Sequence, residues 1–208
     1  MKIIHSKSRL EGFSDAVFAF AATLLVVSLD IPDTFQELTS QLKGFVAFGI
    51  SFFALVLIWK VHYNYFRRIT KIDNWIIGLN MLMVFVLLFY IYPLKFLITL
   101  PFIGDGIQLN EFSQLFQLYG LGFCLVFGSV ALLYVRSMKI EDGEEKKLEF
   151  LFHARHFGTF VITAIVSIIL AYANVGLVYG LPGFAYGLIG PLAALNGKWL
   201  KKKKSSIK

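Results

Sequence analysis

Long runs without a charged residue constrain this chain more than any other feature of its sequence. The longest run covers 42 residues, from 156 to 197, and four others cover 14, 16, 20 and 24 residues. Because a helix needs about 20 consecutive apolar residues to cross a bilayer, the longest run has room for two crossings. The sequence therefore predicts six membrane-spanning helices, at residues 14–30, 42–66, 74–98, 112–136, 155–173 and 176–197.

The composition argues against a soluble or a disordered protein. Hydrophobic residues make up 57% of the chain and charged residues 16%, against about 45–50% and about 25% in soluble domains. The aromatic share of 16% is the reverse of a disordered composition. The single cysteine, Cys124, excludes an intrachain disulfide framework and a cysteine-built zinc site. The connections are short and no internal duplication is evident, so we expect residues 1–208 to form one all-α membrane domain.

The basic residues predict the orientation in the membrane. Of the 20 lysines and arginines, 18 fall on one side of the six predicted helices, and only Lys43 and Lys95 fall on the other. The side that retains basic residues is normally cytoplasmic, so both termini are predicted to be cytoplasmic. We interpret the run Lys201–Lys204 as an anchor to anionic lipids rather than a nucleic-acid site. A cleaved signal peptide is the alternative for the first segment, but Asp30 and Pro32 follow its core where small residues are expected.

The first predicted helix differs from the others. Its uncharged run of 14 residues spans about 21 Å, less than the roughly 30 Å hydrocarbon core. To cross, the helix must include Gly12–Asp15, and a carboxylate there needs a partner unless it lies among the head groups. Arg9 and Glu11 offer imperfect spacing for that role, so other helices are expected to contribute. Further along, one stripe carries Phe20, Thr23, Leu24 and Val27, and another carries Ala19, Ala22 and Val26; one stripe can pack while the other lines a narrow axis.

Several other positions carry a structural expectation. Aromatic residues around Trp59 and His62 are typical of interfacial anchoring, and Asn80 needs a hydrogen bond between helices. Pro93 is expected to kink or end the third helix. The hydrophilic stretch 136–149 is predicted to be a solvated turn followed by a helix start. Glycines and one alanine recur every three or four residues in the sixth predicted helix and predict a closely packed face, at Gly176, Gly180, Gly183, Gly187, Gly190, Ala194 and Gly197.

Taken together, these positions resemble a known family. The start Arg9-x-x-x-Phe13-Ser14-Asp15 is similar to the signature of the endosomal and lysosomal potassium channel family, transmembrane protein 175. The order of the later residues Trp59, His62, Phe66, Asp73, Asn80 and Pro93 resembles its single-repeat bacterial members. The resemblance implies a homotetramer in a bacterial plasma membrane, with a central pore lined by the first helix.

The resemblance also assigns roles to residues. It implies a structural network on the cytoplasmic side made of Arg9, Phe13, Ser14, Asp15, Trp59, His62 and Asn80. It implies a hydrophobic gate at Phe20, Leu24 and Val27, with Thr23 at a threonine position, and no cofactor beyond permeating potassium and other monovalent cations. Phe20 departs from the family pattern, in which an aliphatic residue is usual at this position.

Two other function classes remain open at this point. A secondary transporter would show inverted repeats and ionisable residues at the membrane midplane, and neither is convincing here. An intramembrane enzyme would need a nucleophile with a base, or metal ligands, and no HExxH or GxSxG sequence occurs. His153 and His156 could share a metal on one helix face, but an interfacial pair beside Arg155 is the simpler interpretation. No TVGYG loop is present, so selectivity is expected to come from apolar rings and hydroxyls.

Overall fold

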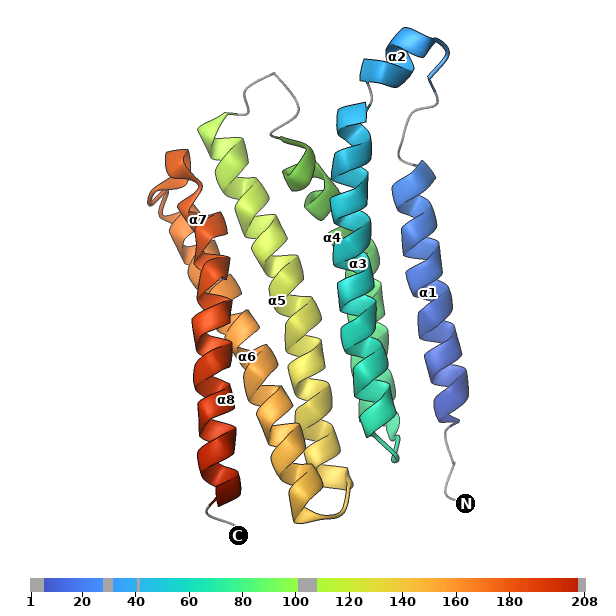
Figure 1. Ribbon diagram of the computed structural model, residues 1–208, viewed down its shortest axis with the longest axis vertical. Coiled ribbons are helices and arrows are strands. Elements are labelled where there is room, and N and C mark those ends of the chain that lie inside the picture. Colours follow the sequence, from blue (N-terminus) through green and yellow to red (C-terminus); the bar gives the residue numbers. More distant parts are fainter. Residues whose placement is uncertain (1–5, 28–31, 41, 101–107, 206–208) are drawn as a thin grey trace.

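The computed structural model describes residues 6–27, 32–40, 42–100 and 108–205, which form an elongated bundle of helices (Figure 1). Its longer elements are α1 (Lys7–Val27), α3 (Leu42–Arg68), α4 (Asn74–Thr99), α5 (Leu109–Ile140), α6 (Glu144–Tyr172) and α8 (Ile189–Ser205). The shorter ones are α2 (Phe35–Ser40), η2 (Leu177–Tyr179), α7 (Leu181–Phe184) and η3 (Ala185–Leu188). The all-α expectation is confirmed for these ranges.

Five of these helices, α1, α3, α4, α5 and α6, are long and apolar enough to cross a membrane. They correspond to the first five predicted spans, although α5 and α6 extend further at their charged ends. α1 begins at Lys7 and includes Gly12–Asp15, as its short apolar run required. Residues 28–30, the end of the first predicted span, lie outside the described residues. α4 continues past Pro93 to Thr99, so this proline does not end the helix.

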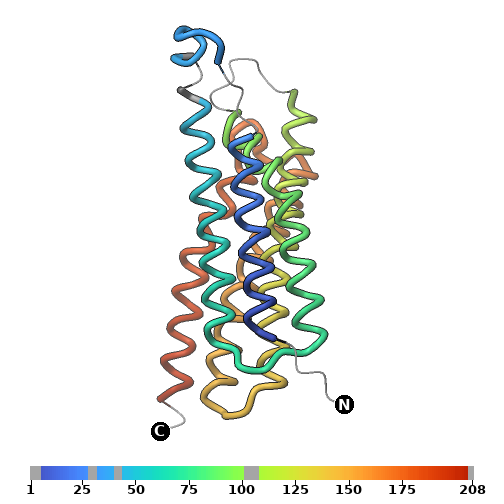
Figure 2. The backbone as a smooth tube through the Cα atoms, turned by 90° about the vertical axis from the view of Figure 1, so that its right-hand side faces the viewer, coloured from blue at the N-terminus to red at the C-terminus, as the bar shows by residue number. Residues whose placement is uncertain are grey.

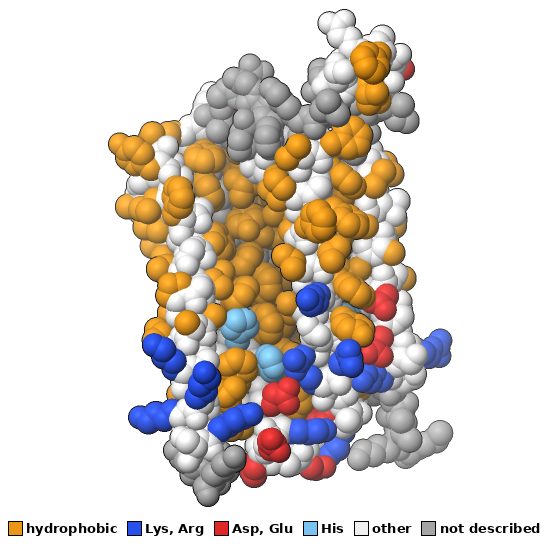
Figure 3. Space-filling model, in the orientation of Figure 1, with side chains coloured by type: hydrophobic (Ala, Val, Ile, Leu, Met, Phe, Trp, Pro, Cys, Tyr) orange, Lys and Arg blue, Asp and Glu red, His pale blue; other side chains and the backbone are white. Residues whose placement is uncertain are grey.

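The helices run nearly parallel to the long axis, and the start of α1 and the end of α8 lie at the same end of the bundle (Figure 2). The turns between α3 and α4 and between α5 and α6 lie at that end too, while α2 lies at the opposite end (Figure 1). Most of the charged side chains on the face in Figure 3 gather in a band at this end, below a broad hydrophobic surface. We call this end of the bundle the basic end. Lys2 and Lys208, which count among the basic residues of the predicted cytoplasmic side, lie outside the described residues.

The prediction of one closely packed glycine helix over residues 176–197 is wrong. Gly176 and Gly180 adopt left-handed backbone conformations, with φ of 60° and 68°, which glycine tolerates without a steric penalty and which interrupts a helix. The segment therefore passes through η2, α7 and η3 before α8 begins at Ile189. A side-chain carbon added at Gly187, Gly190 or Gly197 would meet no other atom within 4 Å, so these glycines mark no close approach.

The prediction of a solvated turn at residues 136–149 is wrong for Glu141. α5 continues to Ile140, α6 begins at Glu144, and Glu141 between them is only 3% exposed. Its carboxylate accepts hydrogen bonds from the backbone N–H groups of Thr70 and Lys71 and from the Thr70 hydroxyl, the last at 2.7 Å. Glu141 therefore fastens the α3–α4 turn to the α5–α6 turn at the basic end.

Candidate pore face and signature cluster

α1 has one face packed against the bundle and one face turned away from it. The packed face consists of Ser14, Phe18, Ala21 and Leu25, all 5% exposed or less, and it contacts α3 and α4. These positions recur at steps of four and three residues, as one side of an α-helix requires. The rest of the bundle therefore leaves the opposite face of α1 without a covering element among the described residues.

The predicted constriction residues lie on the uncovered side of α1. Phe20 is 55% exposed and Val27 73% exposed, although both side chains are large and apolar. Thr23 is exposed between them, and Leu24 is half-buried at the edge of the face. We call Phe20, Thr23, Leu24 and Val27 the pore face.

The hydroxyl of Thr23 is oriented by its own helix. Thr23 Oγ1 donates a hydrogen bond to the carbonyl oxygen of Ala19 at 3.0 Å. Since a hydroxyl has one proton and two lone pairs, the proton is used within the helix and the lone pairs remain available. The pore face therefore offers a hydroxyl oxygen that can accept from water or contact a cation.

The packed face of α1 carries a buried polar cluster that joins three helices. Ser14 Oγ donates to the Leu10 carbonyl at 2.9 Å, so it accepts from Asn80 Nδ2 at 2.8 Å. The amide oxygen of Asn80 then lies 2.9 Å from Nε2 of His62, which must be the donor. Ser14, His62 and Asn80 are at most 2% exposed. These three side chains hydrogen-bond to one another and to the α1 backbone, and they are shielded from solvent. This arrangement suits a structural role rather than ion passage.

Asp15 extends this cluster toward the surface. Its carboxylate accepts a hydrogen bond from Trp59 Nε1 on α3 at 2.9 Å. The His62 ring packs between Phe18 and Phe66, with ring centroids 5.5 and 4.6 Å away. The structure thus brings together Ser14, Asp15, Trp59, His62 and Asn80, and it confirms that Asn80 bonds between helices.

The other two signature residues are not part of this cluster. Arg9 and Phe13 are both exposed, and Arg9 forms no ion pair with the described residues of its own chain. Between α1 and α3 lies a polar cavity of about 350 Å³ bordered by Glu11, Asp15 and His62. Arg9 and Phe13 therefore need a partner outside the described chain if they are to join a network.

Sequence reasoning missed the ion pairs that hold the basic end together. Asp73 caps α4 by accepting from the Ile76 N–H at 3.0 Å, and it pairs with Arg136 of α5, whose Nε lies 2.7 Å away. Although partial burial opposes it, the Arg136 hydrogen bonds lower the pKa of Asp73. Burial would raise the pKa of Glu141, but the hydrogen bonds from Thr70, Lys71 and Lys146 lower it to about 2. The sequence offered one signal for this region: an aspartate at position 73, just before the apolar run of α4, is typical of a helix N-cap.

The histidine pair of α6 lies among aromatic side chains. His153 stacks on Tyr134, with ring centroids 4.9 Å apart, and its Nε2 lies 3.8 Å from the Glu149 carboxylate. Within the described ranges, no group of three or more histidine, cysteine or acidic side chains could hold a metal ion. Cys124 is half-buried on α5.

The chain is similar in sequence to known potassium channels. The profile of the family described as endosomal/lysosomal potassium channel TMEM175 matches residues 9–90, the stretch that holds the pore face and the polar cluster. A Marivirga tractuosa protein named potassium channel is 38% identical over 151 residues, which cover 65% of this chain and 61% of that protein. The aligned part of this chain thus spans about three fifths of that relative's length.

Two solved structures share the fold. A crystal structure of the potassium channel MtTMEM175, bound to a nanobody fusion, superposes with a TM-score of 0.81 at 28% identity and covers 96% of both chains. A crystal structure of a lysosomal potassium-selective channel TMEM175 homolog from Chamaesiphon minutus gives a TM-score of 0.66 at 20% identity. It covers 91% of this chain and 97% of that one. At that identity, the second likeness bears on the fold alone.

Proposed function

We propose that this chain, a homologue of the endosomal/lysosomal potassium channel TMEM175 family, forms a potassium-preferring cation channel in which four copies surround a pore lined by α1. The single observation that carries the proposal is the uncovered pore face: α1 packs on α3 and α4 and turns Phe20, Thr23 and Val27 outward. Copies of such a helix around a symmetry axis produce an apolar path directly.

The chemistry of the pore face favours a hydrophobic gate. Rings of apolar side chains can close a pore by dewetting, and hydroxyl oxygens can replace part of an ion's hydration shell. Phe20, Leu24 and Val27 supply the apolar rings, and the free lone pairs of Thr23 supply the oxygens. Potassium and other monovalent cations are the permeating ions in this proposal, which needs no cofactor.

Arg9 and Phe13 have a role in the proposed assembly. Both are exposed in the single chain, and the polar cavity beside Glu11 and Asp15 is open on the same helix. We infer that Arg9 meets a carboxylate of a neighbouring copy, so that the signature joins subunits as well as helices.

The proposed membrane arrangement has both termini in the cytoplasm of a bacterial cell. The described ends of the chain lie together at the basic end, and the side rich in basic residues is normally cytoplasmic. The broken segment from η2 to α8 returns to that end beside α6 (Figure 1), and we propose that it completes a sixth crossing.

Single-channel recording of the purified protein in planar bilayers tests the function. With asymmetric potassium and sodium, discrete steps that reverse near the potassium equilibrium potential are expected. Slow, saturable exchange without steps would instead indicate a secondary transporter. The carrier and enzyme alternatives are not favoured, because the family and its relatives are ion channels.

A further inference from the structure

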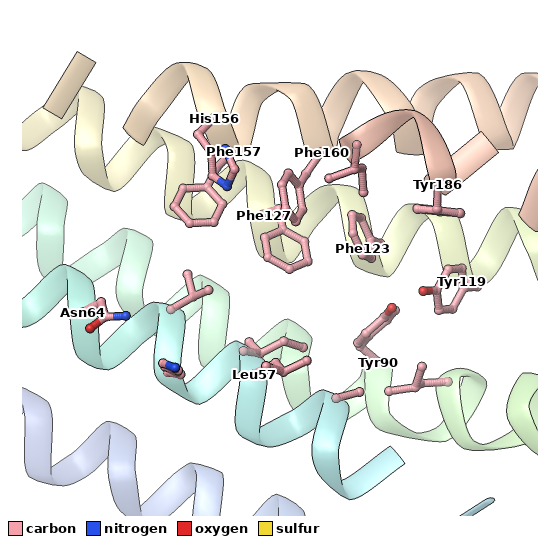
Figure 4. A pocket seen from close by; sticks show the side chains of 16 residues that line it. Leu57, Asn64, Tyr90, Tyr119, Phe123, Phe127, His156, Phe157, Phe160 and Tyr186 are labelled. Carbon is pink, nitrogen blue, oxygen red and sulfur yellow. The ribbon is translucent and has the colours of Figure 1, made fainter. Parts of the chain in front are cut away.

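A groove separates α3 from α6 in the membrane-spanning part of the bundle, on the side away from α1. We call it the α3–α6 groove; its volume is about 460 Å³. Phe123 and Phe127 of α5 and Phe160 of α6 point into it from one side, and Leu57 and Tyr90 face them from the other (Figure 4). In Figure 3 it is the hydrophobic hollow between α8 and α3.

The groove changes character toward the basic end. A second cavity of about 180 Å³ continues from it and shares Asn64 and His156 with it. This lower part is bordered by Arg68 and His153 as well. The Arg68 guanidinium is already paired with Glu149 at 2.9 Å, so its charge is largely compensated.

Lys60 is the uncompensated charge of the groove wall. It is exposed, it lines the α3–α6 groove, and it forms no ion pair with any described residue. It lies eight residues before the end of α3 at Arg68, or about 12 Å along the helix axis. A cation at that depth needs an anionic partner, or its side chain must extend to the interface.

The size of the groove limits what can occupy it. The wall of the groove on α3 runs from Ala54 to Asn64, about 15 Å along the helix axis. An elongated, mainly apolar groove of this kind matches the shape of an acyl chain. The volume lies within the range of about 300–1,000 Å³ that is usual for small-ligand sites.

We propose that the α3–α6 groove binds one anionic phospholipid from the leaflet at the basic end. One acyl chain lies against Phe123, Phe127 and Phe160, and the phosphate pairs with Lys60 near Asn64 and His156. The aromatic wall shields the acyl chain from water, and the ammonium group of Lys60 neutralises the phosphate. The shape of the groove and its charge therefore both favour an anionic phospholipid. The site lies outside the pore face and goes beyond the proposed channel function.

Photo-crosslinking tests the proposal on the full chain. The protein is reconstituted in phosphatidylcholine nanodiscs with a trace of phosphatidylglycerol that carries a diazirine on its acyl chain, and labelled peptides are mapped by mass spectrometry. A phosphatidylcholine probe with the same acyl chain is the lipid control. We expect label on the α5 and α6 walls of the groove, several times more with the phosphatidylglycerol probe.

Two substitutions separate the head-group contact from general electrostatics. Lys60→Gln is expected to lower groove labelling about fivefold, which is the effect of one basic residue on an anionic lipid. Lys139→Gln removes the same charge from an exposed position at the end of α5 and should leave labelling unchanged. Ala54→Phe narrows the groove and should lower labelling with both probes.

Three results would overturn the proposal. Equal groove labelling by both probes in the wild-type chain would show that no anion is selected. Equal effects of Lys60→Gln and Lys139→Gln would assign any preference to the overall surface charge. Absence of label from the groove, with cross-links between copies through Leu57→Cys, would show that a neighbouring subunit occupies it.

Discussion

At the scale of single residues, the buried polar cluster determines how α1 is held. In the structure the Ser14 hydroxyl donates to Leu10 and accepts from the amide nitrogen of Asn80, and with this amide orientation Nε2 of His62 is the donor to the amide oxygen. Asn80 was predicted to bond between helices because a lone amide in an apolar span requires it. Its partners could not be derived from periodicity, because they lie on two other helices, and only the family resemblance grouped them.

Replacing Asn80 by leucine should destabilise the fold. The change leaves the Nε2–H of His62 without an acceptor and removes the amide donor to Ser14. We expect a loss of about 1–2 kcal/mol, the upper part of the range for hydrogen bonds between membrane helices. Thermal unfolding in detergent measures it. Asn64→Leu is the matched control on α3, since no hydrogen bond of the Asn64 side chain is part of the cluster; an equal loss in both variants would argue against the cluster's role.

A second prediction for a single residue concerns Glu141 and the pH dependence of folding stability. Its pKa is about 2 in the fold and about 4.3 in an unfolded chain, so its ionised form is favoured by folding. The resulting stabilisation, about 3 kcal/mol, is fully present above pH 5 and is lost as the pH falls toward 2.

Glu141→Gln should therefore be less stable than the wild type at pH 7, and the difference should shrink below pH 4. Unfolding midpoints measured between pH 3 and pH 7 give this comparison. Glu145→Gln, at an exposed position of the same turn region, is the control. A difference that stays constant across the pH range would mean that the Glu141 charge is not responsible. Hydrophilic composition alone could not reveal this residue, since a buried carboxylate and a solvated one look alike in sequence.

At the scale of helices, the spans were predictable and the close contacts were not. Charge-free runs located α1, α3, α4, α5 and α6, because the membrane requires them to be long and apolar. The regular glycine spacing near the C-terminus suggested tight packing, yet two of those glycines break the helix. On α5, Gly120 lies against Ile168 and Gly122 against the ring of Tyr90, and of the predicted series Gly183 lies close to Phe116. Spacing alone does not distinguish a packed glycine from one that ends a helix.

Gly122→Ala should push α4 and α5 apart. The added methyl group would overlap the ring of Tyr90, which is 4% exposed and cannot move freely. Overpacking of this kind costs about 1–3 kcal/mol. Gly128→Ala on the same helix is the control, because its methyl would meet Val161 at an ordinary 3.7 Å. Unfolding midpoints of the two variants should differ clearly; similar midpoints would mean that the α4–α5 contact is loose enough to adapt.

At the scale of the whole molecule, one face of α1 is left uncovered by the described part of the chain. α1 exposes large apolar residues next to the signature residues Arg9 and Phe13, which have no partner within the described chain. The sequence located this helix through its short apolar run and its carboxylate. It could not show which stripe faces outward, because that depends on where α3 and α4 pack.

Asp15→Asn should weaken the assembly before it changes ion preference. If Asp15 meets Arg9 of a neighbouring copy and the contact is buried in the assembly, removing either partner costs about 3–5 kcal/mol, so Arg9→Gln should have the same effect. Native mass spectrometry of the detergent-solubilised protein measures the tetramer fraction. Glu145→Gln, an exposed carboxylate in the turn region between α5 and α6, serves as the control. A stable tetramer with altered selectivity would place Asp15 in the ion path instead.

The pore face gives the most direct test of the assembled molecule. If Phe20 lies at the axis, four rings form the narrowest and least wettable level, so Phe20→Ala should raise the single-channel conductance. Thr23→Val keeps the volume and deletes the hydroxyl oxygen, and it should lower the preference for potassium over sodium more than the open probability. If Phe20 instead packs between helices, its truncation costs about 3–5 kcal/mol of stability and leaves conductance unchanged. Recordings from verified tetramers of both variants distinguish these cases, and unchanged conductance together with unchanged selectivity would remove the pore from this face of α1.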